Sequence, residues 1–448
     1  MMVRLTPLRL LGAALVLTVF FFASILPALL RALVHGERGY DVFVERPPPV
    51  LATAAPTVRF GDECAPFSAG VMRDVTFVLK IGAGQAQTQL PAHLARLGRC
   101  KQDLLIFSDR KDSLHGVDIA DALAHLRPEY RFNNADFDVY DRIQHGNLSA
   151  AHSPDGARLD KYKTLPMVEW TAYMRPAALW FVFVELDTYL NYDNLYRFLT
   201  HFSPRAAHYL GAPVLAKRRP AHAHGGSGFV LSRGALDKVM ALGRMFGENK
   251  HFPGTHFFGQ DVRSFATGDD VLAQVLKKSG VSLRGYWPMF NEEPPAGIRY
   301  SRDQWCEAII SLHRLDHAAF AALGTWEQAR KHPERPLTFE ELFTMAEPYM
   351  QDKVLDWSNL SHDVVYKKGS APAKSFDQCH GACLQDGRCM QFEHNGIECR
   401  LQRSLRLGHQ QPPDSEHKWT SGWMTGRIAA FKKANSPCQA PHFVHSHP

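Results

Sequence analysis

The chain has 448 residues, of which 45% are hydrophobic and 21% are charged. This length and composition are typical of a globular protein with two or three domains and a sizeable core. The 51 basic and 45 acidic residues leave a net charge of +6. Because the basic residues are scattered, apart from Lys217-Arg218-Arg219, the sequence gives little support to nucleic-acid binding.

The N-terminal segment predicts a membrane anchor. Residues 10–30 are 21 positions without a charge, enough to cross a bilayer as a helix, and no clear cleavage site follows them. Residues 1–9 would then be a cytosolic tail, and the proline-rich residues 31–70 a stem. We expect a single-pass type II membrane protein whose body lies in the lumen of the secretory pathway.

Cysteines and glycosylation sequons agree with this compartment. The chain has eight cysteines and two N-glycosylation sequons, at Asn147 and Asn359. Four of the cysteines lie within residues 379–399, and this density predicts a small disulfide-rich module. Metal binding competes with that interpretation, but the module has no C-x2-C pair. Cys64 and Cys100 flank the first predicted strand and helix, and we expect them to pair.

An alternation of strands and helices begins after residue 70. Residues 75–80 predict a strand that ends in a glycine turn, residues 90–97 a helix, and residues 103–109 a second strand. This order is typical of the start of an open α/β sheet. The glycine turn, Gly82-Ala83-Gly84, lacks the third glycine of a dinucleotide-binding fingerprint. Residues 110–160 give no clear prediction.

The most informative strand carries two acids. An apolar run, residues 180–184, leads directly into Glu185 and Asp187. On an extended chain, residues two positions apart point the same way, so the two carboxylates would face one spot. That arrangement suits a divalent cation that carries a phosphate-bearing substrate. Two solvated acids at a strand end are the alternative, and the spacing alone does not decide.

Three later stretches contain further candidate residues. Residues 222–232 place three glycines before a short strand, either for close approach of a ligand or as a plain turn. Asp269 and Asp270 lie in the first turn of a predicted helix, where an N-cap is the default explanation. Residues 305–313 predict a strand that ends in a histidine, which is either structural or a ligand.

Together these blocks resemble the Fringe-like glycosyltransferases of glycosyltransferase family 31, closest to their fungal, membrane-anchored branch. The Asp-Thr-Tyr block after Leu186 and the glycine block are the specific parts of the resemblance. Two departures are Leu186 itself, where many relatives carry a smaller or acidic residue, and Lys80-Ile81, where Lys-Thr is frequent. The resemblance covers roughly residues 70–320.

The resemblance implies an α/β fold of the GT-A type, an open mixed sheet flanked by helices, over residues 71–345. It implies an inverting transfer from a UDP-sugar to a hydroxyl of a glycan or glycoprotein, with β1,3 linkage. Mn2+ or another divalent cation is expected on Asp187 and His313, and Asp269 is expected to be the base, with Asp270 as the second candidate. The residues expected at the nucleotide-sugar are Lys80, Asp109, Glu185, Gly225, Gly226, Ser227 and Gly228.

Residues 366–434 separately resemble a PAN or apple module, followed by a tail at residues 435–448. This resemblance implies the disulfides Cys379–Cys399 and Cys383–Cys389, and binding of a protein or a carbohydrate; whether Cys306 pairs with Cys438 stays open. The expected localisation is the Golgi or another secretory membrane. The alternative function is a non-catalytic carbohydrate- or protein-binding membrane protein with a degenerate transferase body.

Overall fold

The computed structural model describes residues 42–44, 70–97, 103–126, 128–152, 154–215, 219–246, 261–439 and 441–444. Apart from Val42, which begins β1 (Val42–Val44), all of them belong to one compact unit, residues 43–448. The expected anchor at residues 10–30, the stem apart from residues 42–44 and 70, and the Cys64–Cys100 pair lie outside the described residues. Among the helices described, none has both the length and the apolar character that a membrane span requires.

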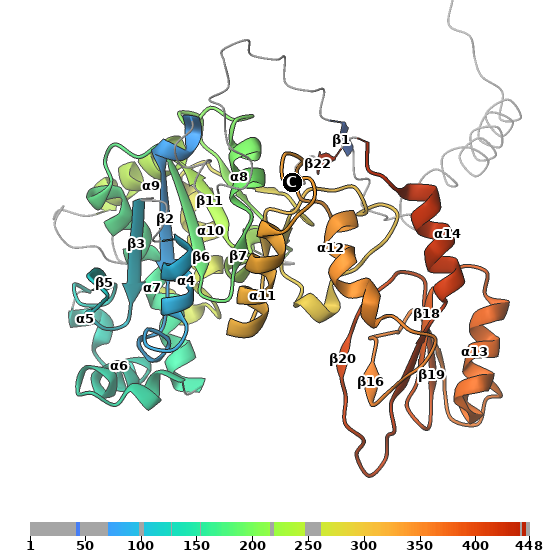
Figure 1. The fold of residues 1–448 in the computed structure, drawn as a ribbon. Coiled ribbons are helices and arrows are strands. Elements are labelled where there is room, and N and C mark those ends of the chain that lie inside the picture. The colour runs from blue at the N-terminus through green and yellow to red at the C-terminus, as the bar shows by residue number, and fades with distance from the viewer. Residues whose placement is uncertain are drawn as a thin grey trace, which may run out of the picture. The chain divides into compact units, whose positions relative to one another are not determined.

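An eight-stranded mixed sheet forms the centre of the N-terminal part (Figure 1). The spatial order of the strands is β12 (Leu283–Gly285), β8 (Tyr209–Gly211), β11 (Phe229–Ser232), β6 (Trp180–Glu185), β2 (Val75–Lys80), β3 (Asp103–Ser108), β5 (Val117–Asp121) and β4 (Asp112–Leu114). Strands β6, β2, β3 and β5 run parallel to one another, whereas β11 and β4 run antiparallel to their neighbours.

Helices cover both faces of this sheet because its central strands are apolar on both sides. The helices of the two layers are α4 (Leu90–Leu97), α6 (Asp136–Gln144), α7 (Pro154–Met174), α8 (Tyr192–Leu199), α9 (Arg233–Phe246) and α10 (Gly268–Lys278), and α5 (Pro128–Arg131) precedes α6. In β6, Phe181 and Phe183 pack into one core cluster, with residues of α6, α7, α9 and α10. Trp180, Val182 and Val184 point the other way, into a second cluster with residues of α4 and α8.

The predicted strand over residues 305–313 is mostly wrong. Only β14 (Ser311–Leu312) is a strand, and it pairs with β13 (Phe290–Asn291) and β7 (Tyr189–Leu190) in a small second sheet. The preceding residues make backbone hydrogen bonds to separate segments: Ala308 N–H donates to His442, and Ile309 N–H donates to Leu337. Among the described residues, no one strand pairs along residues 305–310, whereas β14 brings His313 to the edge of the second sheet. The helices α11 (His317–Gln328) and α12 (Phe339–Ala346) follow.

The C-terminal part is built on a five-stranded antiparallel sheet with one helix, α13 (Phe376–Gln385), packed against it. Cys379–Cys399 ties the helix to the sheet and Cys383–Cys389 ties the helix to the loop behind it, so the implied pairing is confirmed. The strands lie in the order β15 (Val354–Leu355), β21 (Thr420–Trp423), β18 (Gln391–His394), β19 (Cys399–Gln402) and β17 (Val364–Tyr366), and β16 (Trp357–Ser358) pairs with β20 (His409–Gln410) nearby.

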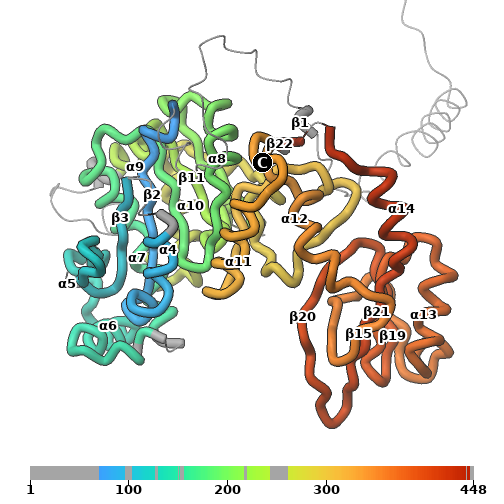
Figure 2. The backbone as a smooth tube through the Cα atoms, in the orientation of Figure 1, coloured from blue at the N-terminus to red at the C-terminus, as the bar shows by residue number. Residues whose placement is uncertain are grey.

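After this sheet the chain returns to the N-terminal part (Figure 2). It leaves through α14 (Thr425–Asn435), and Cys438 then forms a disulfide with Cys306, the pairing that the sequence left open. The final strand, β22 (His442–Val444), exchanges backbone hydrogen bonds with Cys306 and Ala308. Phe443 is 5% exposed and belongs to the core cluster beneath β6. The described end of the chain is therefore part of the N-terminal core.

The two sequons differ sharply in the structure. Asn147 is exposed, whereas Asn359 is 0% exposed and lies inside the C-terminal sheet region. The Asn359 amide nitrogen donates to the carbonyls of Phe392 and Gly422, at 3.0 and 3.3 Å, and its oxygen accepts from Ser361 Oγ at 2.7 Å. A glycan on Asn359 is incompatible with these contacts, so interpreting that sequon as a glycan acceptor is wrong for the folded protein.

Replacing Asn359 with alanine should destabilise the protein by about 2–4 kcal/mol, because two buried carbonyl groups lose their donor. Asn147→Ala, at an exposed asparagine of the same motif, is the matched control and should change stability by less than about 0.5 kcal/mol. Urea unfolding followed by tryptophan fluorescence measures both. Equal stability of the two variants would contradict the structural role of Asn359.

Candidate functional site

The candidate site lies where β2 and β6 end side by side. The two strands are parallel, and their last residues, Lys80 and Glu185, are direct neighbours in the register. Lys80 Nζ lies 2.8 Å from a Glu185 oxygen, in an ion pair that is mostly shielded from solvent. Burial by itself lowers the pKa of Lys80, but the charges of Glu185, Asp160 and Asp269 together outweigh it and the pKa is raised, so Lys80 stays cationic.

The chain does not stay extended after Glu185. The prediction that Glu185 and Asp187 face one spot because they lie two positions apart on a strand is therefore wrong. The strand ends at Glu185, and residues 186–187 form a turn. Thr188 stabilises this turn: its N–H donates to the Glu185 carbonyl at 3.1 Å, and its Oγ accepts from the Glu185 N–H at 3.2 Å. The same hydroxyl donates to the Gly226 carbonyl at 2.6 Å. The turn presents Asp187 toward the second sheet.

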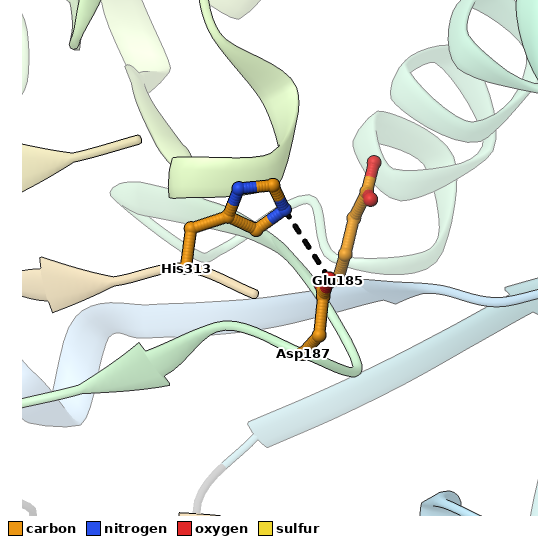
Figure 3. Close-up of side chains that lie close together, drawn as sticks. All are labelled: Glu185, Asp187 and His313. Atoms are coloured by element: carbon orange, nitrogen blue, oxygen red, sulfur yellow. Dashed lines mark ion pairs between the residues drawn. The ribbon is translucent and has the colours of Figure 1, made fainter. Parts of the chain in front are cut away.

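Asp187 meets His313, which lies directly after β14. Figure 3 shows the imidazole ring directed at the Asp187 carboxylate, with Nε2 3.3 Å from Oδ2. Together with Glu185, each of the three residues offers one ligand atom, and these atoms lie within 4.8 Å of one another. Two carboxylate oxygens and one imidazole nitrogen are a donor set that fits Mn2+ or a similar divalent cation.

The pKa of His313 reflects its contact with Asp187. Burial lowers the pKa of His313, but the hydrogen bond and the charge of Asp187 raise it above the usual histidine value overall. A cation bound at the same atoms would replace that proton, because metal ligands bind in their deprotonated forms.

The glycine block makes this arrangement possible. Gly225 and Gly226 begin the short 3₁₀ helix η6 (Gly225–Ser227). A Cβ atom on Gly226 would lie 2.2 Å from Nε2 of His313, and one on Gly225 would lie 2.5 Å from an Asp269 oxygen. Gly228 has a φ of +78° and ends the turn before β11. Side chains at the first two positions would therefore displace the histidine and the aspartate.

Asp269 and Asp270 have different surroundings, although they are adjacent in α10. Thr267 caps this helix by accepting from the Asp270 N–H at 3.4 Å, so neither acid is the N-cap. Asp270 pairs with Arg219. Asp269 instead accepts the Gly225 N–H at 2.9 Å and lines a small pocket with Lys80. The geometry favours Asp269 over Asp270 as the acid at the site.

Burial raises the pKa of Asp269, and the Glu185 charge adds to this effect, whereas Lys80 and the Gly225 hydrogen bond oppose it. A carboxylate with a raised pKa is a stronger proton acceptor than an ordinary aspartate. The pocket around it is lined by Lys80, Thr164, Met167, Phe183, Val184, Glu185, Gly225, Phe229 and Asp269.

Asp109 and Ser227 are buried in this structure. Asp109 is 1% exposed, accepts the Ala83 N–H at 2.7 Å and lies 3.5 Å from Lys163 Nζ. Lys163 also donates to the Ile81 carbonyl at 3.1 Å, so it ties α7 to the ends of β2 and β3. Ser227 accepts a 2.5 Å hydrogen bond from Ser311 at its carbonyl. These contacts shape the loops at the site, and direct nucleotide contact by Asp109 stays a prediction.

Sequence reasoning missed two residues of α7, Lys163 and Thr164. Thr164 lines the pocket, and a Cβ atom on Gly268 would lie 2.0 Å from its Oγ. The only available signal was the helical spacing of Asp160 and Lys163, whose side chains are 2.5 Å apart. Such pairs are common on solvent-exposed helices, so the spacing alone does not indicate a site.

Comparison with known proteins agrees with this geometry at a coarse level. Residues 123–282 match the family model described as Fringe-like, which is less than half of the chain. The matched range contains Glu185, Asp187, the glycine block and Asp269, and it ends before His313. Fringe-like proteins are glycosyltransferases, so the match supports a transferase of this class. A search of curated proteins found no match.

Gly226→Ala should weaken Mn2+ binding by about tenfold or more, because the added methyl group displaces the His313 ring. Gly426→Ala is the control: a Cβ atom at this helical position meets nothing within 4 Å. Isothermal titration with MnCl2 measures the affinity, and thermal unfolding reports on the fold. If the Gly226 variant binds Mn2+ like the unmodified protein, His313 is not part of a metal site.

Proposed function

We propose that this protein is a metal-dependent inverting glycosyltransferase that moves a sugar from a UDP-sugar to a hydroxyl of a glycan or glycoprotein. The observation that carries the proposal is the convergence of Asp187, His313 and Glu185 on one spot at the sheet edge where Asp269 also lies. The β1,3 linkage is expected from the resemblance to family 31. The Fringe-like match supports the transferase class.

Three residues of the chain are the proposed metal ligands. Asp187 and His313 would hold Mn2+ or another divalent cation, with Glu185 beside them. The bound cation would stabilise the negative charge that develops on the leaving diphosphate. Because Glu185 also forms an ion pair with Lys80, at 2.8 Å, it is the weakest of the three candidate metal ligands.

Asp269 would act as the general base. The acceptor hydroxyl attacks the anomeric carbon, the bond from that carbon to the diphosphate oxygen breaks, and the hydroxyl proton passes to Asp269. The Gly225 N–H holds one carboxylate oxygen and fixes its orientation. Because the pKa of Asp269 is raised, turnover should increase with pH along a limb above the usual titration range of an aspartate.

We also propose that the protein is a type II membrane protein of the Golgi or another secretory compartment. The disulfides Cys306–Cys438, Cys379–Cys399 and Cys383–Cys389 support an oxidising environment. The C-terminal sheet with its disulfide-linked helix supports a PAN-like module, which would bind a protein or a carbohydrate.

Asp187→Asn should abolish UDP release from UDP-sugars and Mn2+-dependent UDP binding. Asp269→Asn should reduce turnover by about 10²-fold or more while UDP binding persists, because only the proton acceptor is lost. Asp237→Asn is the control, since Asp237 has a 61% exposed side chain on α9. UDP release is measured over a panel of UDP-sugars with and without Mn2+.

Two outcomes would contradict these roles. Activity of the Asp187 variant would remove the metal assignment, and loss of UDP binding in the Asp269 variant would make that residue structural. If the unmodified protein hydrolyses or transfers from no donor of the panel, the carbohydrate- or protein-binding alternative is favoured.

The membrane topology can be tested through the sequons. In a eukaryotic secretory host, a lumenal body should carry an N-glycan on Asn147 and none on Asn359, because Asn359 is buried. Endoglycosidase digestion and peptide mapping give the answer, and Asn147→Gln should remove the mobility shift. A full-length protein without any glycan would argue for a cytosolic body.

A further inference from the structure

His224 lies at the start of the glycine block, one residue before Gly225. Its Nδ1 accepts a hydrogen bond from the Ser227 N–H at 3.1 Å, so the side chain caps the 3₁₀ turn. A ring nitrogen that accepts from an N–H group carries no proton itself, so the neutral ring has its proton on Nε2. The cap therefore fixes which nitrogen is the donor.

The surroundings of His224 include a proposed metal ligand, His313, and the proposed base, Asp269. Its ring centroid lies 5.1 Å from that of His313, with the planes at 68°. The adjacent Gly225 donates its N–H to Asp269 at 2.9 Å, so the backbone at His224 also lies next to the proposed base. Among the described residues, none is a hydrogen-bond partner of Nε2, and the side chain is only partly buried.

His224 is not one of the residues whose ligand atoms converge, which are Glu185, Asp187 and His313. Its Nδ1 is occupied by the backbone, and its Nε2 carries the proton, so neither nitrogen has a free lone pair for a cation. What the ring offers at the site is a hydrogen-bond donor without a charge. Such a donor suits an anionic oxygen next to a cation, because a charged imidazolium would repel the cation.

We propose that His224 is a substrate-contacting residue whose Nε2–H donates a hydrogen bond to a phosphate oxygen of a nucleoside diphosphate. This inference rests on the proposed function, which brings a diphosphate to the cation held by Asp187 and His313. The turn that positions Gly225 and Gly226 thus also orients a donor toward the same ligand. The competing explanation is that His224 only caps the turn.

Two substitutions separate the roles of the ring nitrogens. His224→Asn retains an acceptor near the position of Nδ1 and is a favourable N-cap, but it removes the Nε2 donor. His224→Gln places an amide N–H near the position of Nε2 and lacks the capping acceptor. Mn2+ affinity, UDP affinity in the presence of Mn2+, and thermal unfolding are measured by titration calorimetry and calorimetric scanning on the full chain.

His224→Asn should unfold like the unmodified protein and bind Mn2+ normally, but bind UDP about tenfold more weakly or worse, as expected for a lost hydrogen bond to a charged group. His224→Gln should bind UDP within about threefold of the unmodified protein, although its unfolding temperature falls with the loss of the cap.

Two results would overturn the inference about His224 alone. One is unchanged UDP affinity in the Asn variant, and the other is an equal loss of UDP affinity in the two variants, which would reflect the turn instead of the donor. If the unmodified protein binds Mn2+ but not UDP, the proposed function fails, and the inference about His224 fails with it.

Discussion

The close approach of the backbone at Gly225 and Gly226 is the constraint on which the candidate site depends. Two adjacent residues without a Cβ let one turn contact Asp269 on one side and His313 on the other. The hydroxyl of Thr188 holds the Gly226 carbonyl and the turn after Glu185 together. Residues from β6, α10 and the segment after β14 are therefore brought together by a single short turn.

Where the sequence carries local physical signals, it predicts the structure well. The strand at 75–80 and the helix at 90–97 have the predicted bounds, because an apolar run and a glycine turn determine both. The pairing of Asp187 with His313 came from the family resemblance, since no spacing rule connects residues so far apart in the chain. The sequence does not predict the structure of the segment before His313, because its backbone partners, among them Leu337 and His442, come from distant parts of the chain.

The acids at the sheet edge differ in their charged partners, so they do not form a symmetric acidic pair. Glu185 is compensated by Lys80, Asp187 by His313, and Asp270 by Arg219, while Asp269 accepts only a backbone N–H among these contacts. Burial raises the pKa of Asp269, and among the described residues no cationic side chain in direct contact reverses this effect, which suits a proton acceptor. Unequal partners thus give similar acids different chemistry.

The return of the chain to its N-terminal core affects how the protein can be made. Phe443 completes a cluster whose other members lie between residues 72 and 310, so the core is filled only after the C-terminal module has been synthesised. During translation, the N-terminal part cannot complete this core until residues more than a hundred positions downstream of His313 have been made. Expressing that part alone would expose the apolar surface that Phe443 covers, and recombinant fragments should therefore keep the C-terminal strand.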